Sequence, residues 1–149
     1  MMVVVLAGAV VLAVVANAVV YVIVTGPLGE PLLMCSDCSA IPPGLSAMDM
    51  YEPILFSTVF GVGAVVVYAV ISALSARPLR VFAIVATVLL FVSLGAPASM
   101  PSPPIEWSAK LTLMAMHVVG YSMILGTIWF GHRRGWLTSQ KGRNDGTRL

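Results

Sequence analysis

Charged residues are scarce in this sequence. Asp, Glu, Lys and Arg make up 9% of the 149 residues, while 59% are hydrophobic. Soluble domains carry roughly 25% charged residues. Side chains this apolar could not cover a surface that faces water, and the mean hydropathy of +0.99 agrees. The shortage of charge argues against a water-soluble domain and predicts that lipid is the main solvent.

The groups that usually carry chemistry are sparse as well. The chain has two cysteines and two histidines, with no phosphate-binding Gly-rich loop, no Ser-His-Asp set and no pair of acids inside an apolar run. A structural zinc site needs four ligands, of which a single CxxC supplies two. His132 follows the last apolar run and could not share a haem with His117 inside it. We therefore expect no catalytic residue, no cofactor, no resident metal and no nucleic-acid partner.

Long apolar runs are what the sequence does contain. Each has close to the 20 or so residues that cross about 30 Å of hydrocarbon. In lipid a lone strand leaves its backbone amides unpaired, so runs of this length must be helical. The predicted fold is all-α: a polytopic membrane protein whose single domain, 1–149, is a four-transmembrane-helix bundle. The predicted spans are residues 3–24, 54–74, 79–96 and 105–130.

The first run also has a feature of a signal peptide. Ala16-Asn17-Ala18 resembles a small-residue cleavage site. No basic segment precedes the run, however, and its apolar character continues past this point. We expect the first helix to be retained.

Basic residues are divided unevenly among the segments that connect the runs. The loop 25–53 holds four acids and no Lys or Arg, whereas seven of the eight basic residues lie in the short second loop or the tail 131–149. Basic loops stay in the cytoplasm. The sequence therefore predicts a multi-pass plasma-membrane protein with both termini cytoplasmic and the loop 25–53 outside.

Both cysteines lie in that outer loop, as Cys35-Ser-Asp-Cys38. Outside the cytoplasm, oxidising conditions let disulfides persist. Asp37 and the lack of a basic neighbour disfavour a reactive thiolate. We expect a Cys35–Cys38 disulfide that fixes the shape of a loop without an obvious element. Copper(I), which accepts thiolate and thioether ligands, is an alternative because several methionines lie nearby.

The fourth run carries a polar row, in which Lys110, Met114, His117 and Tyr121 are spaced by 4, 3 and 4 residues. This spacing puts all four on one helix face. Polar groups in hydrocarbon need partners, so we predict that the face points into the bundle.

An α-helix rises about 1.5 Å per residue, so counting residues from the outer boundary predicts which polar groups lie at the same depth in the membrane. The count places His117 near Asn17 and Tyr121 near Tyr68, which gives an intramembrane polar cluster of Asn17, Tyr68, Lys110, His117 and Tyr121. Two interpretations stay open. The cluster either holds helices together or forms a small polar pocket that opens outward past Lys110 and Glu106.

Small residues at four-residue spacing predict where helices pack closely. The positions are Ala9, Ala13 and Asn17 in the first run, Ser57 and Gly61 in the second, Ala83 and Thr87 in the third, and Ser122 and Gly126 in the fourth.

Three stretches resemble a known pattern: "NAVVYVI", "RPLRVFAIVATVLLFVSLGAP" and "KLTLMAMHVVGY". The chain is similar to a family of small uncharacterised four-span bacterial membrane proteins, with Asn17, Arg77-Pro78 and Met116-His117 at the matching positions. The resemblance implies the four-helix architecture and no activity. The CSDC segment is not part of that pattern.

The favoured function is a non-catalytic accessory or scaffolding subunit of a larger membrane complex, such as a transporter. Its expected partners are membrane lipids together with other membrane subunits or further copies of itself. The alternative is an outward-facing thiol-disulfide redox or copper(I)-binding protein that uses Cys35, Cys38 and the His117 face. The chain resembles quinone-linked four-helix thiol oxidases in span count and outward CxxC, but it lacks their second cysteine pair.

The predicted orientation and disulfide can be tested together. A membrane-impermeant thiol reagent should label Cys35 and Cys38 on intact cells only after reduction, because both sulfurs face outward and are oxidised. A Cys35→Ser, Cys38→Ser variant is the control for other thiols. Labelling that requires lysis of reduced cells would reverse the orientation, and labelling without reduction would contradict the disulfide.

Overall fold

The computed structural model describes residues 2–37, 44–100 and 105–137, with residues 34–37 described by their backbone alone. Its helices are long and apolar enough to cross a membrane. Each coincides with one predicted span to within a few residues, so the all-α, four-helix prediction is confirmed. The helices are α1 (Met2–Thr25), α2 (Tyr51–Leu74), α3 (Pro78–Ser99) and α4 (Trp107–Arg133).

The loop between α1 and α2 contains regular structure that the sequence did not predict. Two short strands, β1 (Leu33–Asp37) and β2 (Gly44–Ala47), pair antiparallel with a register shift between Cys35 and Asp37. The two strands contain Ser, Asp, Gly and Ala, which have low strand propensity. Neither segment alternates apolar and polar residues, so the sequence pattern did not predict a strand there.

The hairpin is fixed to the bundle at its base. The Met48 amide donates to the Leu32 carbonyl at 2.7 Å, which extends the pairing beyond β1 and β2. Both side chains are buried. The Tyr21 hydroxyl of α1 donates to the Met48 carbonyl at 2.8 Å. The first connection is therefore docked on the end of α1.

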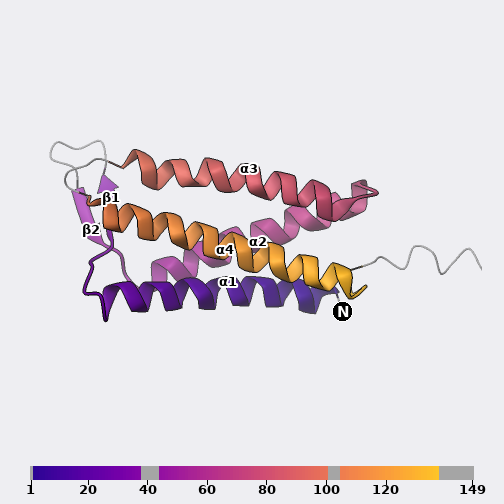
Figure 1. Ribbon diagram of the computed structural model, residues 1–149, viewed down its shortest axis with the longest axis horizontal. Coiled ribbons are helices and arrows are strands. Elements are labelled where there is room, and N and C mark those ends of the chain that lie inside the picture. The colour runs from indigo at the N-terminus through magenta and orange to yellow at the C-terminus, as the bar shows by residue number, and fades with distance from the viewer. Residues whose placement is uncertain (1, 38–43, 101–104, 138–149) are drawn as a thin grey trace, which may run out of the picture.

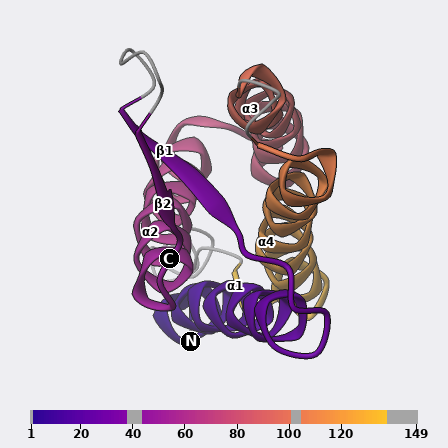
Figure 2. The same ribbon diagram turned by 90° about the vertical axis from the view of Figure 1, so that its left-hand side faces the viewer.

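Each helix packs mainly against two neighbours, so the bundle is a ring. α1 lies between α2 and α4, and α3 lies between the same two helices on the other side (Figure 2). α2 and α3 are joined by a short turn and diverge from it toward the hairpin (Figure 1). α2 consequently packs on α1 near its start and on α3 near its end.

The two ends of the bundle differ in their connections and their charge. The hairpin strands, the end of α3 and the start of α4 lie at one end, which we call the hairpin end (Figure 1). The N-terminus, the α2–α3 turn and the last turn of α4 lie at the other. We call this the arginine end, after Arg77, Arg80, Arg133 and Arg134.

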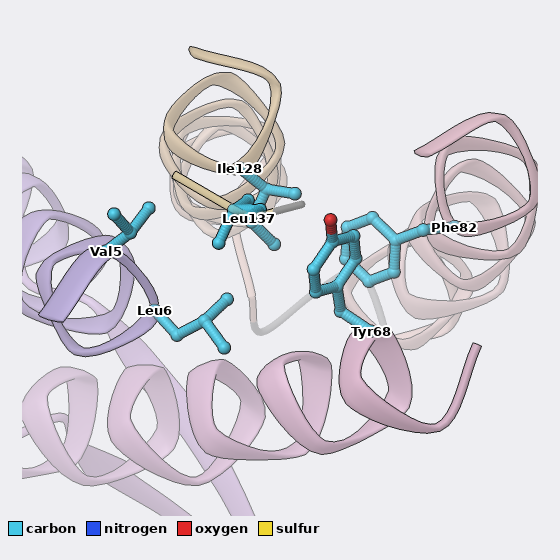
Figure 3. Close-up of a cluster of buried hydrophobic side chains, with 6 residues drawn as sticks. All are labelled: Val5, Leu6, Tyr68, Phe82, Ile128 and Leu137. Carbon is cyan, nitrogen blue, oxygen red and sulfur yellow. The ribbon is translucent and has the colours of Figure 1, made fainter. Parts of the chain in front are cut away.

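An apolar cluster lies near each end. The arginine-end cluster joins all four helices to the segment after α4 (Figure 3); its members are Val5, Leu6, Tyr68, Phe82, Ile128 and Leu137. The hairpin-end cluster joins the hairpin base to α4; its members are Leu32, Met48, Ile105, Ala109, Leu113 and Met116.

Between the clusters, small residues bring α1 close to its neighbours. Ala9 and Ala13 are buried, as the sequence predicted. A Cβ added to Gly61 of α2 would lie 3.1 Å from the Val10 side chain. Close backbone approach of this kind replaces the hydrophobic effect as the source of helix association in lipid.

A larger residue at Gly61 should separate α1 from α2. We expect Gly61→Leu to lower the free energy of unfolding by about 1–3 kcal/mol through overpacking, measured by thermal or denaturant unfolding in micelles. Gly63→Leu is the matched control, because a Cβ at Gly63 meets nothing within 4 Å. Equal losses in both variants would contradict the proposed contact.

Candidate functional site

The polar residues within the membrane helices are the candidate site, and Lys110 is the most deeply buried of their charges. Its side chain is 2% exposed. The Nζ atom donates to the Met100 carbonyl at 2.6 Å and lies 4.7 Å from the centroid of the Trp107 ring. Met100 is the C-cap of α3, where a cation satisfies an end carbonyl and the negative end of the helix dipole.

Lys110 thus joins the end of α3 to the first turn of α4. The pocket interpretation required an opening past Lys110 and Glu106. Glu106 is exposed, but Lys110 is closed in by its own contacts. The geometry at this position favours helix attachment over an entrance.

Asn17 lies where α1, α2 and α4 meet. Its Nδ2 donates to Ser57 Oγ of α2 at 2.8 Å. On the other side, a Cβ added to Gly120 of α4 would lie 3.3 Å from the same Nδ2 atom. Asn17 Oδ1 is buried and has no hydrogen-bond partner within the described part of the chain. One amide therefore packs against two neighbouring helices at once.

Tyr121 and Thr87 form the corresponding contact between α4 and α3. Their hydroxyl oxygens are 2.8 Å apart. Thr87 uses its only hydroxyl proton toward the Ala83 carbonyl at 2.7 Å, so the tyrosine is the donor in the bond to Thr87.

His117 is half-buried, and its hydrogen bond stays within α4. Its Nδ1 lies 2.7 Å from the Leu113 carbonyl. Because a carbonyl oxygen only accepts, the proton must be on Nδ1. This leaves Nε2 as the nitrogen that could accept a hydrogen bond or bind a metal.

Tyr68 belongs to the arginine-end cluster. Its ring meets the Phe82 ring edge to face, with centroids 5.3 Å apart (Figure 3). The Tyr68 hydroxyl and the Ser72 hydroxyl one turn later are both buried.

The hydrogen bonds of Asn17 and Tyr121 go to other residues than those predicted to lie at the same depth in the membrane. Asn17 bonds Ser57 rather than His117, and Tyr121 bonds Thr87 rather than Tyr68. These two bonds join different pairs of helices, α1 with α2 and α4 with α3. The sequence marked Ser57 and Thr87 as small packing residues, and spacing alone gave no indication that they would be hydrogen-bond partners.

The cysteine motif is described only in part. The Cys35 backbone pairs with Leu45 in the hairpin, but its side chain and the whole of Cys38 lie outside the described residues. The disulfide therefore stays a prediction. Within the described residues no three His, Cys, Asp or Glu side chains gather as metal ligands would.

A family model for a family of unknown function (DUF6069) matches residues 2–129. The chain belongs to the DUF6069 family. No curated protein and no solved structure matches it. The DUF6069 match extends through Trp129, so it includes almost all of the four-helix bundle but ends before Arg133. The expectation of an uncharacterised four-span membrane family is confirmed.

The motifs that carried the resemblance have structural positions in this DUF6069 protein. Asn17 joins three helices, Pro78 opens α3 after the N-cap Arg77, and Met116 packs in the hairpin-end cluster. His117 follows Met116 on α4 without a bond to another helix among the described contacts. Three of these positions thus support the bundle itself.

A double-mutant cycle should detect the Asn17–Ser57 bond. We expect Asn17→Ala and Ser57→Ala to show a coupling of about 0.6 kcal/mol, as is typical of interhelical hydrogen bonds in membranes, when unfolding is measured in micelles. Thr58→Ala is the control partner, because Thr58 is exposed and bonds Ile54 of its own helix. Coupling of Asn17 with Thr58 but not with Ser57 would contradict the assignment.

Proposed function

We propose that this protein is a non-catalytic subunit of a larger membrane complex and that it docks a partner's transmembrane helices on α2 and α3. The observation that carries the proposal is an asymmetry of burial. In the most apolar 18-residue windows of α1 and α4, 28% and 22% of residues are buried, whereas the figure is 11% for both α2 and α3. Within the bundle, α2 and α3 are thus less buried than α1 and α4.

α2 and α3 carry large, exposed aromatic side chains. Phe60 of α2 is 67% exposed and Phe91 of α3 is 70% exposed. Phe56 lies one turn before Phe60 on the same face of α2. Van der Waals packing drives helix association in lipid, and aromatic side chains supply large contact areas for it. These faces suit a helix of another protein.

The internal polar contacts support a structural role. Lys110, Asn17 and Tyr121 each bond a neighbouring helix or its cap. Because these side chains are hydrogen-bonded to neighbouring helices, they hold the bundle in one shape. A docking subunit requires such a fixed shape. The structural interpretation of the polar row therefore has more support than the pocket interpretation.

The proposed setting is the plasma membrane with the arginine end in the cytoplasm. Four arginines at that end, against Lys110 alone among described basic residues at the other, support this orientation. The hairpin with the cysteine motif is then outside, where a disulfide would persist and fix the shape of the loop.

The alternative function uses Cys35 and Cys38 for thiol redox chemistry or copper(I) binding with the His117 face. His117 Nε2 is the one group of this set whose described geometry suits a ligand. Serine variants of both cysteines separate the two functions: a scaffold keeps its partners, whereas a redox or copper protein loses its activity or its metal.

Partner docking can be tested by purification in mild detergent followed by native mass spectrometry. We expect a stoichiometric complex with another membrane protein. The Phe60→Ala, Phe91→Ala double variant should lose at least about tenfold in partner recovery, as truncation of an interfacial aromatic costs more than 1 kcal/mol.

The matched control is Val15→Ala, Val19→Ala, which shortens two exposed side chains on α1. It should keep the partner. Recovery of a monomer alone would overturn the proposal, and so would recovery of a complex that the α2–α3 variant leaves intact. A complex of identical chains would replace the partner subunit with a homo-oligomer.

A further inference from the structure

An open groove of about 360 Å³ runs between α3 and α4. Its lining extends along α4 from Tyr121 to Trp129, a rise of about 12 Å. We call it the α3–α4 groove. It is lined by Leu79 and Ala83 of α3 and by Tyr121, Ser122, Leu125, Gly126 and Trp129 of α4.

The groove exists because small residues of α4 face outward. The sequence predicted Ser122 and Gly126 at a close helix contact, and this is wrong. Both are exposed, and a Cβ at Gly126 would meet nothing within 4 Å. The Ser122 hydroxyl bonds the Val118 carbonyl of its own helix at 2.7 Å, which leaves a mainly apolar surface beside it.

The groove ends beside a cation of α4, and α3 carries an arginine one turn before its own lining residue Ala83. The Arg133 guanidinium lies 4.1 Å from the centroid of the Trp129 ring, whose side chain lines the groove. On α3, the exposed Arg80 precedes Ala83 by one turn and is therefore placed on the adjoining face. Tryptophan is enriched where membrane helices meet lipid headgroups, so Trp129 next to Arg133 is expected at that level.

We propose that the α3–α4 groove binds an acyl chain of an anionic phospholipid whose phosphate is held by Arg133 and Arg80. A phospholipid presents a negative phosphate next to an apolar chain, which is the order of cation and apolar surface along the groove. An anionic lipid carries no cationic group to repel the arginines, so it is preferred over a zwitterionic lipid. This site is separate from the aromatic side chains proposed to dock a partner.

The experiment compares retention of phosphatidylglycerol and phosphatidylcholine with the same acyl chains. The full chain is reconstituted with an equal mixture, extracted in mild detergent and examined by native mass spectrometry. We expect one phosphatidylglycerol per chain. Arg133→Gln should reduce the preference for phosphatidylglycerol about fivefold, the effect of one basic residue at an anionic lipid surface.

Matched variants separate this site from general charge and from misfolding. Arg134→Gln removes the neighbouring charge, which lies over the Phe130 ring instead of the groove, and should keep the preference. Gly126→Leu should fill the groove and abolish retention of the lipid, whereas Gly63→Leu, also at an open position, should not. Circular dichroism and elution volume report whether each variant folds.

Four outcomes would overturn the site. They are no stoichiometric lipid on the wild-type chain, equal effects of Arg133→Gln and Arg134→Gln, lipid retention by a folded Gly126→Leu variant, and a dimer that Gly126→Leu dissociates. The last would assign the groove to a second copy of the chain. If Gly126→Leu fails to fold, the two arginine variants alone decide.

Discussion

Hydrocarbon supplies no hydrogen-bond partners, and the rest of this structure depends on that constraint. The backbone meets it by forming four helices, each of which pairs its own amides and carbonyls. Asn17 and Tyr121 meet it by bonding a neighbouring helix, and His117 by bonding the backbone of its own helix. The Asn17–Ser57 and Tyr121–Thr87 bonds therefore mark where α1 meets α2 and where α3 meets α4.

The same constraint explains the two ends. At the hairpin end, the ammonium group of Lys110 satisfies the Met100 carbonyl that α3 leaves unpaired, and the Tyr21 hydroxyl satisfies Met48 at the base of the hairpin. The connections there are held by specific bonds. At the arginine end, the guanidinium groups of Arg133 and Arg134 instead lie over the Trp129 and Phe130 rings.

Both proposed roles use surfaces of the bundle and not an interior site. α1 and α4 bury more of their surface within the bundle, while α2 and α3 leave aromatic side chains exposed. Outward-facing Ser122 and Gly126 hollow the α3–α4 boundary. Because lipid and partner helices compete for apolar surface, shape and charge decide which of them occupies each face.

The sequence by itself determined the fold class, because scarce charge and four apolar runs of membrane length leave no other arrangement for the backbone. It also identified the buried row of Ala9, Ala13 and Asn17. Only the tertiary structure decided that Asn17 meets Ser57, that Ser122 and Gly126 face outward, and that β1 and β2 pair. Spacing along a helix gives depth and relative face, but the rotation of each helix against its neighbours comes from packing among all four.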